Sequence, residues 1–221
     1  MASSLRHRTA RVLLLPLLIL ALLLWWDWNW FKPLVERQAS AAIGRSVSIG
    51  NLDVQLSRTP LISLDGIEVA NPEDMADSAP LAQLQQLALR LSLTELFDRR
   101  LHLLSVRLQK PVLALQRNDR GVSNWALTLP ASDSDSAPWQ MQIDALTIVD
   151  GRLSLVDTPQ KTDIRGTVRT AETDGHSAPA LLATAKGRYA AEPFEAQLTA
   201  GAVLRLRTPE DAYPIDLQLT S

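Results

Sequence analysis

The chain has 221 residues, a formal net charge of −2 and 46% hydrophobic residues, and it contains no cysteine. The near-neutral charge argues against a nucleic-acid partner, and the lack of cysteine excludes disulfides, thiolate metal sites and cysteine nucleophiles. This length suits one domain, or one domain with an extension.

The first predicted element is a single membrane-spanning helix over residues 12–31. Three arginines within residues 1–11 precede an apolar run from Val12 to Trp26. A span of about 20 residues matches the hydrocarbon thickness of a bilayer. By the positive-inside rule, the flank over residues 1–11 is expected in the cytoplasm and the rest of the chain across the membrane.

Tryptophans mark the far end of this predicted span. Indole rings favour the headgroup region of a bilayer, and four are expected there: Trp25, Trp26, Trp28 and Trp30. No small residue lies between Leu22 and Val35, so the pattern of a signal-peptide cleavage site is missing. A retained anchor is therefore favoured over a cleaved signal peptide or a buried soluble helix.

After the span, the sequence predicts one short helix followed by strands. Pro33 to Ile43 has helical spacing and is ended by Gly44, and we expect this helix to cap a sheet rather than to lie on the membrane. From Val47 onward apolar and polar residues alternate, which indicates strands. Asp65-Gly66 and Asp150-Gly151 lie between alternating runs, as the turns of β-hairpins do.

The predicted β body has two parts. Residues 32–130 form the first, an acidic Ser/Asp segment over 131–138 forms a linker, and residues 139–221 continue the sheet. The segments Leu104–Leu115 and Leu146–Leu155 share a pattern of strand, break and strand. Such repeats predict a mainly β chain with one meandering, antiparallel, curved sheet. The final residues stop in mid-alternation, so the chain is expected to be incomplete.

No catalytic constellation is visible in the sequence. The histidines His7, His102 and His176 lack the spacing of metal ligands, and each is expected at the surface or at a strand edge. Motifs that pair a nucleophile with a base are missing as well. We therefore predict no catalytic, cofactor or metal site and no enzymatic activity.

An apolar stripe is the most informative pattern. Its members alternate with polar residues in two adjacent predicted strands: Leu87, Leu89, Leu91, Leu93, Leu104, Val106 and Leu108. A second sheet or a helix would cover this stripe in an ordinary core, which the pattern alone favours. In the second interpretation the sheet is open, and its apolar concave face holds acyl chains. Periodicity does not separate the two, because both bury the same face.

The order of several motifs resembles the AsmA family over about Val12 to Leu155. The motifs that carry the likeness are WFKPLVE at 30–36, AIGRSV at 42–47, IGNL at 49–52, ISLDGIEVANP at 62–72, KPVLALQR at 110–117, GVSNW at 121–125 and the segment 146–155. The resemblance implies a chorein-like β groove, with residues 32–130 as its first domain. It also implies a single-pass protein of a bacterial inner membrane with a periplasmic body.

The function implied by the resemblance is non-enzymatic. Such a protein would hold or pass membrane phospholipids along an apolar β groove in the maintenance of the outer membrane. The alternative is a structural or regulatory factor for the assembly or membrane targeting of outer-membrane proteins, which would make envelope proteins its partners. The family has no known catalytic residues, so none is carried over to this chain.

Overall fold

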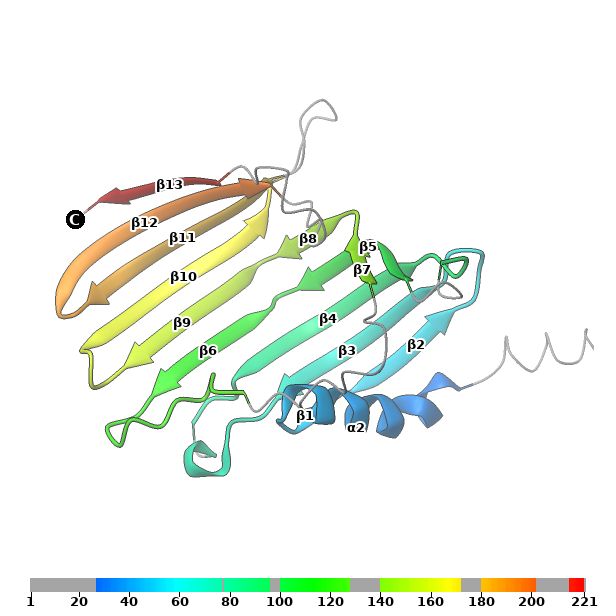
Figure 1. Ribbon diagram of the computed structural model, residues 1–221, viewed down its shortest axis with the longest axis horizontal. Coiled ribbons are helices and arrows are strands. Elements are labelled where there is room, and N and C mark those ends of the chain that lie inside the picture. Colours follow the sequence, from blue (N-terminus) through cyan, green and yellow to red (C-terminus); the bar gives the residue numbers. More distant parts are fainter. Residues whose placement is uncertain are drawn as a thin grey trace, which may run out of the picture.

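The computed structural model describes residues 27–76, 78–95, 100–127, 140–171, 180–201 and 215–220. Its thirteen strands form one curved sheet, and a single α-helix lies at the first edge of that sheet (Figure 1). The prediction of a mainly β chain with a short following helix is confirmed. Residues 12–26 of the predicted span lie outside the described residues, and within the described ranges no helix is long and apolar enough to cross a membrane.

The elements follow one another along the chain in this order: η1 (Trp28–Phe31), α2 (Lys32–Ile43), β1 (Val47–Ser48), β2 (Asn51–Gln55), β3 (Leu61–Val69), η2 (Glu73–Met75), β4 (Ala82–Leu91), β5 (Arg100–Gln109), β6 (Val112–Arg117), β7 (Gln140–Ile143), β8 (Leu146–Val149), β9 (Gly151–Asp157), β10 (Thr162–Thr170), β11 (Ala180–Tyr189), β12 (Glu192–Gly201) and β13 (Ile215–Thr220). Helix α2 matches the predicted helix to within one residue. Gly44 ends it in the left-handed conformation, with φ 69°, which glycine adopts without steric cost.

Helix α2 and the preceding turn η1 close the first edge of the sheet. Backbone N–H groups of an edge segment need acceptors if they are not to pair with another chain. Here, side chains of η1 and α2 supply them. The three bonds run from Val47 N–H to Ser40 Oγ (2.9 Å), from Ile49 N–H to Glu36 Oε1 (2.7 Å) and from Leu52 N–H to Asn29 Oδ1 (3.0 Å).

The same helical elements also cover apolar surface at this edge. Ile49, Leu52 and Leu64 form a buried cluster, and Trp28 of η1 and Val35 of α2 pack against it. The predicted capping role of the short helix is therefore confirmed, and it combines hydrogen bonding to the sheet edge with burial of side chains on one face.

Both predicted Asp-Gly hairpins are wrong. Strand β3 runs straight through Asp65-Gly66, and β8 passes into β9 at Asp150-Gly151 without reversing direction. A type I′ hairpin turn needs two successive residues with positive φ. In each of these two pairs only one residue has a positive φ: Gly66 (62°) in the first and Asp150 (53°) in the second. Ala190-Ala191, with φ values of 50° and 72°, does make such a turn between β11 and β12.

The prediction of a wholly antiparallel sheet is also wrong in one place. Strands β5 and β6 form one long, interrupted strand, and β7, β8 and β9 form another that runs parallel to it. The register pairs Val106 with Leu146 and Leu113 with Leu153. The two similar sequence segments are thus neighbours in the sheet rather than two hairpins.

A line of left-handed residues crosses the middle of the sheet, and we call this line the crease. It contains Gly66 in β3, Lys110 between β5 and β6 (φ 47°), and Asp150 between β8 and β9. The Lys110 N–H donates to the Val149 carbonyl at 2.8 Å, so the last two interruptions lie side by side. Backbone pairing continues on both sides of the crease.

The crease keeps the apolar side chains on one face of the sheet. Side chains of a strand alternate between faces, so a shift by one residue moves an apolar set to the other face. Across the crease, apolar residues that share a face are an odd number of positions apart, so the pattern has shifted by one. Leu64 and Ile67 belong to one cluster, and Leu108, Leu113, Ile148 and Leu153 line one hollow.

Asn124 joins the two halves of the sheet below the crease. Strand β4 pairs with only the first two residues of β6, and beyond them the fully buried Asn124 takes the place of a strand. It exchanges two hydrogen bonds with the backbone of Gln116 (2.9 and 3.0 Å) and donates to the Ala114 carbonyl (2.7 Å). It also donates to Asn71 Oδ1 (2.9 Å), which lies 53 residues earlier in the chain.

Asn124→Ala is expected to lower the free energy of unfolding by about 2–4 kcal/mol, because it leaves the Gln116 amide and the Ala114 carbonyl without their partners. Urea denaturation of the purified chain measures this. In the control, Asn51→Ala removes one exposed hydrogen bond to Asn29 and should cost less than about 1 kcal/mol. Equal losses in the two variants would contradict the role given to Asn124.

Candidate functional site: an uncovered apolar groove

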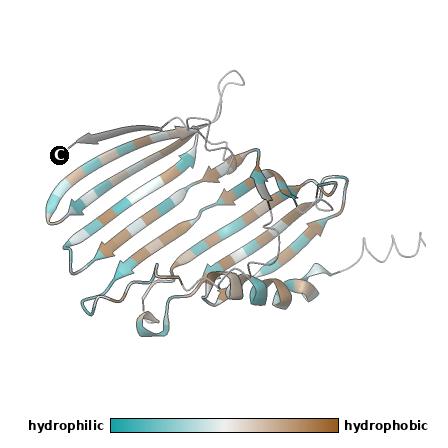
Figure 2. Cartoon of the chain, viewed as in Figure 1, coloured by the Kyte–Doolittle hydropathy of each residue, from teal (hydrophilic) through white to brown (hydrophobic). Residues whose placement is uncertain are grey.

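The apolar face of the sheet continues beyond the part that α2 covers. Leu87 of β4 pairs with Leu108 of β5, and Leu89 pairs with Val106. Leu108 in turn pairs with Ile148 of β8. Four of the seven predicted stripe residues therefore form two cross-strand pairs on this face. Figure 2 shows the apolar and polar positions alternating along the strands.

The other three stripe residues lie differently. The pairing of β4 with β5 shifts by one residue at Leu91, which faces Leu103 instead of continuing the period. Leu104 is passed over in this register, and Leu103, which the sequence analysis missed, is the buried residue. Leu93 lies beyond the end of β4 and is 40% exposed. A strict period of two does not reveal such an irregularity.

A hollow of about 540 Å³ opens on this face. The side chains or backbone of fourteen residues line it: Leu108, Pro111, Leu113, Ile148, Arg152, Leu153, Gly166, Thr167, Val168, Ala183, Thr184, Ala185, Ala196 and Leu198. Apart from Pro111, all of them belong to strands of the one sheet. Within the part of the chain that is described, no helix and no second sheet contributes to the lining.

Small residues on three strands account for the depth of the hollow. Gly166 of β10, Ala183 and Ala185 of β11, and Ala196 of β12 stand where larger apolar side chains would fill the space. A Cβ atom on Gly166 would lie 2.5 Å from the Thr184 carbonyl oxygen, so only glycine fits there. The apolar face is therefore covered beside α2, whereas from β5 to β12 no described element covers it.

Chemically, this groove suits hydrocarbon. Its lining is almost entirely apolar, and each CH₂ group that it removes from water contributes about 0.8 kcal/mol. Arg152, Thr167 and Thr184 also border the hollow, but they alternate with residues of the apolar face, so their side chains point to the opposite face of the sheet. There Thr167 and Thr184 bond to each other through their hydroxyl groups at 2.9 Å. Nothing in this lining forms a nucleophile–base pair.

Away from the groove, His102 lies between two carboxylates. Its Nδ1 atom is 2.7 Å from Glu95 Oε1, and its Nε2 atom is 2.7 Å from Asp144 Oδ2. The hydrogen bond to Glu95, aided by Asp144 and opposed by desolvation, raises the pKa of His102 above its usual value. The imidazole is only 15% exposed, and it links the segment after β4 to the loop between β7 and β8. His7 and His176 lie outside the described residues.

No metal centre accompanies this histidine. Among the residues that the structure describes, no group of three or more histidine, aspartate or glutamate side chains is arranged to hold a metal ion.

The predicted interfacial tryptophans divide into two sets. Trp25 and Trp26 lie outside the described residues. Trp28 packs against the buried cluster next to α2, and its ring centre is 5.9 Å from that of Phe31. Trp30 is 78% exposed, which is unusual for so large an apolar side chain.

The pH dependence of the free energy of unfolding should reveal the contact of His102 with Glu95 and Asp144. Because its pKa is raised in the folded state, its stabilising contribution is complete below the unfolded value of about 6.5 and disappears as the pH rises through the folded pKa. Thermal unfolding between pH 6 and 9 should therefore show stability falling with pH. His102→Gln should flatten that slope, and an unchanged slope in this variant would contradict the assignment.

Comparison with known proteins agrees with the motif order. The family model described as the AsmA family matches residues 1–211. The chain is also 24% identical to the AsmA family protein YhjG of Escherichia coli (strain K12) over 243 aligned residues, which cover 95% of this chain and 35% of the relative. The chain thus spans about a third of the length of that curated relative.

Proposed function

This chain belongs to the AsmA family, and we propose that it is a non-enzymatic protein that holds or passes phospholipid along its apolar groove in the maintenance of the outer membrane. The observation that supports this proposal best is the uncovered hollow on β5 to β12. An apolar face of this kind on a single-layer sheet needs an occupant, because its exposure to water is unfavourable.

The proposed mechanism is passive. Acyl chains lie against Leu108, Ile148, Leu153 and Leu198, while the headgroups stay in water. No single contact holds the lipid tightly, since the stabilisation is spread over many CH₂ groups. A lipid can therefore shift along the groove by exchanging one set of apolar contacts for an equivalent set on the next strand.

We also propose a location for the body. Because Trp28–Phe31 form η1 on the sheet, an anchor that begins at residue 12 would end before them. It would place residues 1–11 in the cytoplasm and the sheet in the periplasm, on the outer side of a bacterial inner membrane. Helix α2 follows η1 directly, so the covered end of the groove would lie at the membrane surface. The exposed indole of Trp30 suits the headgroup region there.

A second candidate function is a structural or regulatory factor in the assembly or membrane targeting of outer-membrane proteins. The observation that favours it is the edge at β13, which pairs with β12 and with no other described strand. Exposed edges accept extended segments of partner chains. Crosslinks to nascent barrel proteins, combined with an absence of bound lipid, would favour this function.

The groove is tested by two adjacent residues of β12 that point to opposite faces. Leu198 lines the hollow, whereas Gln197 is exposed on the other face. Leu198→Asp should reduce co-purified phospholipid about tenfold or more, since a carboxylate in apolar surroundings is costly. Gln197→Asp adds the same charge outside the groove and should retain the lipid. Mass spectrometry of the organic extract provides the measurement.

A folded Leu198→Asp variant with wild-type lipid content would refute the groove as the binding site. Ala185→Phe serves as a second test if the charged variant fails to fold, because a larger apolar side chain fills the hollow without adding charge. Its lipid content should also fall. Circular dichroism confirms that each variant keeps its sheet.

A further inference from the structure

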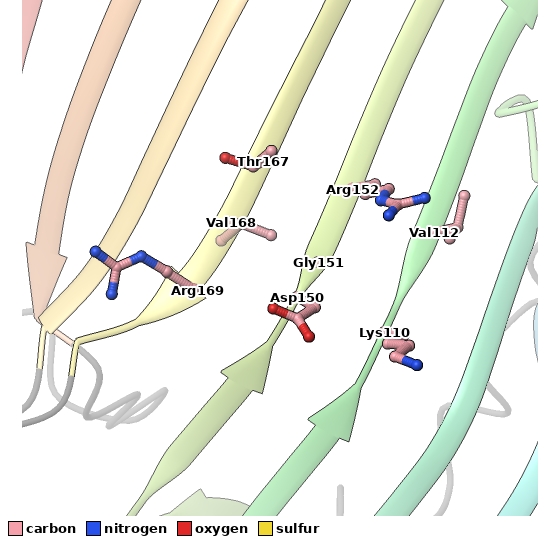
Figure 3. A pocket seen from close by; sticks show the side chains of 8 residues that line it. All are labelled: Lys110, Val112, Asp150, Gly151, Arg152, Thr167, Val168 and Arg169. Carbon is pink, nitrogen blue, oxygen red and sulfur yellow. The ribbon is translucent and has the colours of Figure 1, made fainter.

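A second pocket, lined by basic side chains, lies at the crease (Figure 3). Its volume is about 620 Å³. The lining residues are Lys110, Val112, Asp150, Gly151, Arg152, Thr167, Val168 and Arg169. They come from three adjacent strand segments: the Lys110–Val112 junction, the start of β9 and the end of β10.

This basic pocket opens on the face opposite the groove. Arg152 is followed by Leu153, which lines the groove, and successive side chains of a strand point to opposite faces. The register pairs Val112 with Arg152 and Arg152 with Thr167, so these side chains share the second face. The two hollows lie back to back, separated by the backbone of β9 and β10.

The charged residues of this pocket lie on neighbouring strand segments at the crease, and the Arg152 and Arg169 side chains extend in opposite directions (Figure 3). Lys110 and Arg169 stand two residues from Val112 and Thr167 respectively, toward the same end of the strands as Asp150. The left-handed conformations of Lys110 and Asp150 interrupt the regular pleat between them, which leaves room for a ligand.

The pocket has an excess of positive charge. The lining contains three cationic side chains, those of Lys110, Arg152 and Arg169, and one carboxylate, that of Asp150. None of the three forms an ion pair within 4 Å with a described residue, whereas Arg117 and Arg165 do with Asp157 and Asp163. Like charges gathered in this way repel one another, and a bound anion would remove that repulsion.

We propose that this pocket binds a phosphate group, carried either by a lipid headgroup or by a soluble phosphate compound. A phosphate with up to two negative charges matches the surplus charge of the pocket. The planar guanidinium groups of Arg152 and Arg169 suit bidentate contacts to its oxygens once these exposed side chains turn toward the ligand. The sheet separates this pocket from the groove, so its ligand is a different molecule from any lipid whose chains lie in the groove beside it.

Inorganic phosphate is the first probe, titrated calorimetrically into the full chain in a non-ionic detergent at low salt. Saturable binding is expected. Arg152→Gln combined with Arg169→Gln should weaken it at least tenfold, since each charge-assisted hydrogen bond contributes about that factor. The control pair, Arg165→Gln and Arg188→Gln, removes two exposed arginines of β10 and β11 outside this pocket and should change affinity by less than about threefold.

A variant that gains affinity makes the test independent of misfolding. Asp150→Asn removes the carboxylate that competes with the ligand, and asparagine tolerates the left-handed backbone at this position. Phosphate should bind several-fold more tightly to this variant. No saturable binding in either the wild type or Asp150→Asn would overturn the proposal, and so would an equal loss in the Arg152/Arg169 and Arg165/Arg188 pairs.

Dihexanoyl phosphatidic acid, a water-soluble lipid, identifies the source of the phosphate. Tighter binding than that of inorganic phosphate, lost in the Arg152/Arg169 variant, assigns the pocket to a lipid headgroup. Equal affinity assigns it to soluble phosphate. The Leu198→Asp variant should bind inorganic phosphate like the wild type, so failure of the groove and failure of this pocket are separate results.

Discussion

The rest of the fold depends on the closing of the sheet's first edge. A single-layer sheet leaves two needs at that edge, since its backbone donors require acceptors and its apolar face requires cover. Ser40 and Glu36 of α2 meet the first need, and Val35 of the same helix meets the second. With this edge closed, strands can be added in one direction only, so the groove has a covered beginning and extends away from it.

The crease determines what the two faces of the sheet can do. Long strands that twist regularly would carry an alternating sequence unchanged from end to end. At the left-handed residues Lys110 and Asp150, the alternating pattern of apolar residues instead moves by one position, and the apolar side chains stay on the same face. On the opposite face, the same interruption lies among the residues that line the basic pocket. One backbone irregularity therefore shapes both the apolar groove and the basic pocket.

Local patterns predicted the local features well. Proline and glycine marked the helix, and alternation marked the strands. Two cross-strand pairs of the apolar face, Leu87 with Leu108 and Leu89 with Val106, followed from the stripe, although only Leu108 of the stripe lines the hollow. Pairing partners were harder to predict, because Asp-Gly favours positive φ without requiring it at both residues. Ala190-Ala191 makes a true turn without that composition. The basic pocket, the contact of Asn124 with Asn71 and the shift to Leu103 depend on partners distant in sequence.

The number of hairpins in the region from β9 to β12 determines how long the groove is. Each strand adds about 4.8 Å across the sheet, and a hairpin returns the chain to the same end of the strands. Duplication or loss of a hairpin would therefore change how far the groove reaches while leaving its cross-section and its sealed first edge as they are. Evolution could in this way adjust reach in steps of about 10 Å, without redesigning the apolar lining of the groove.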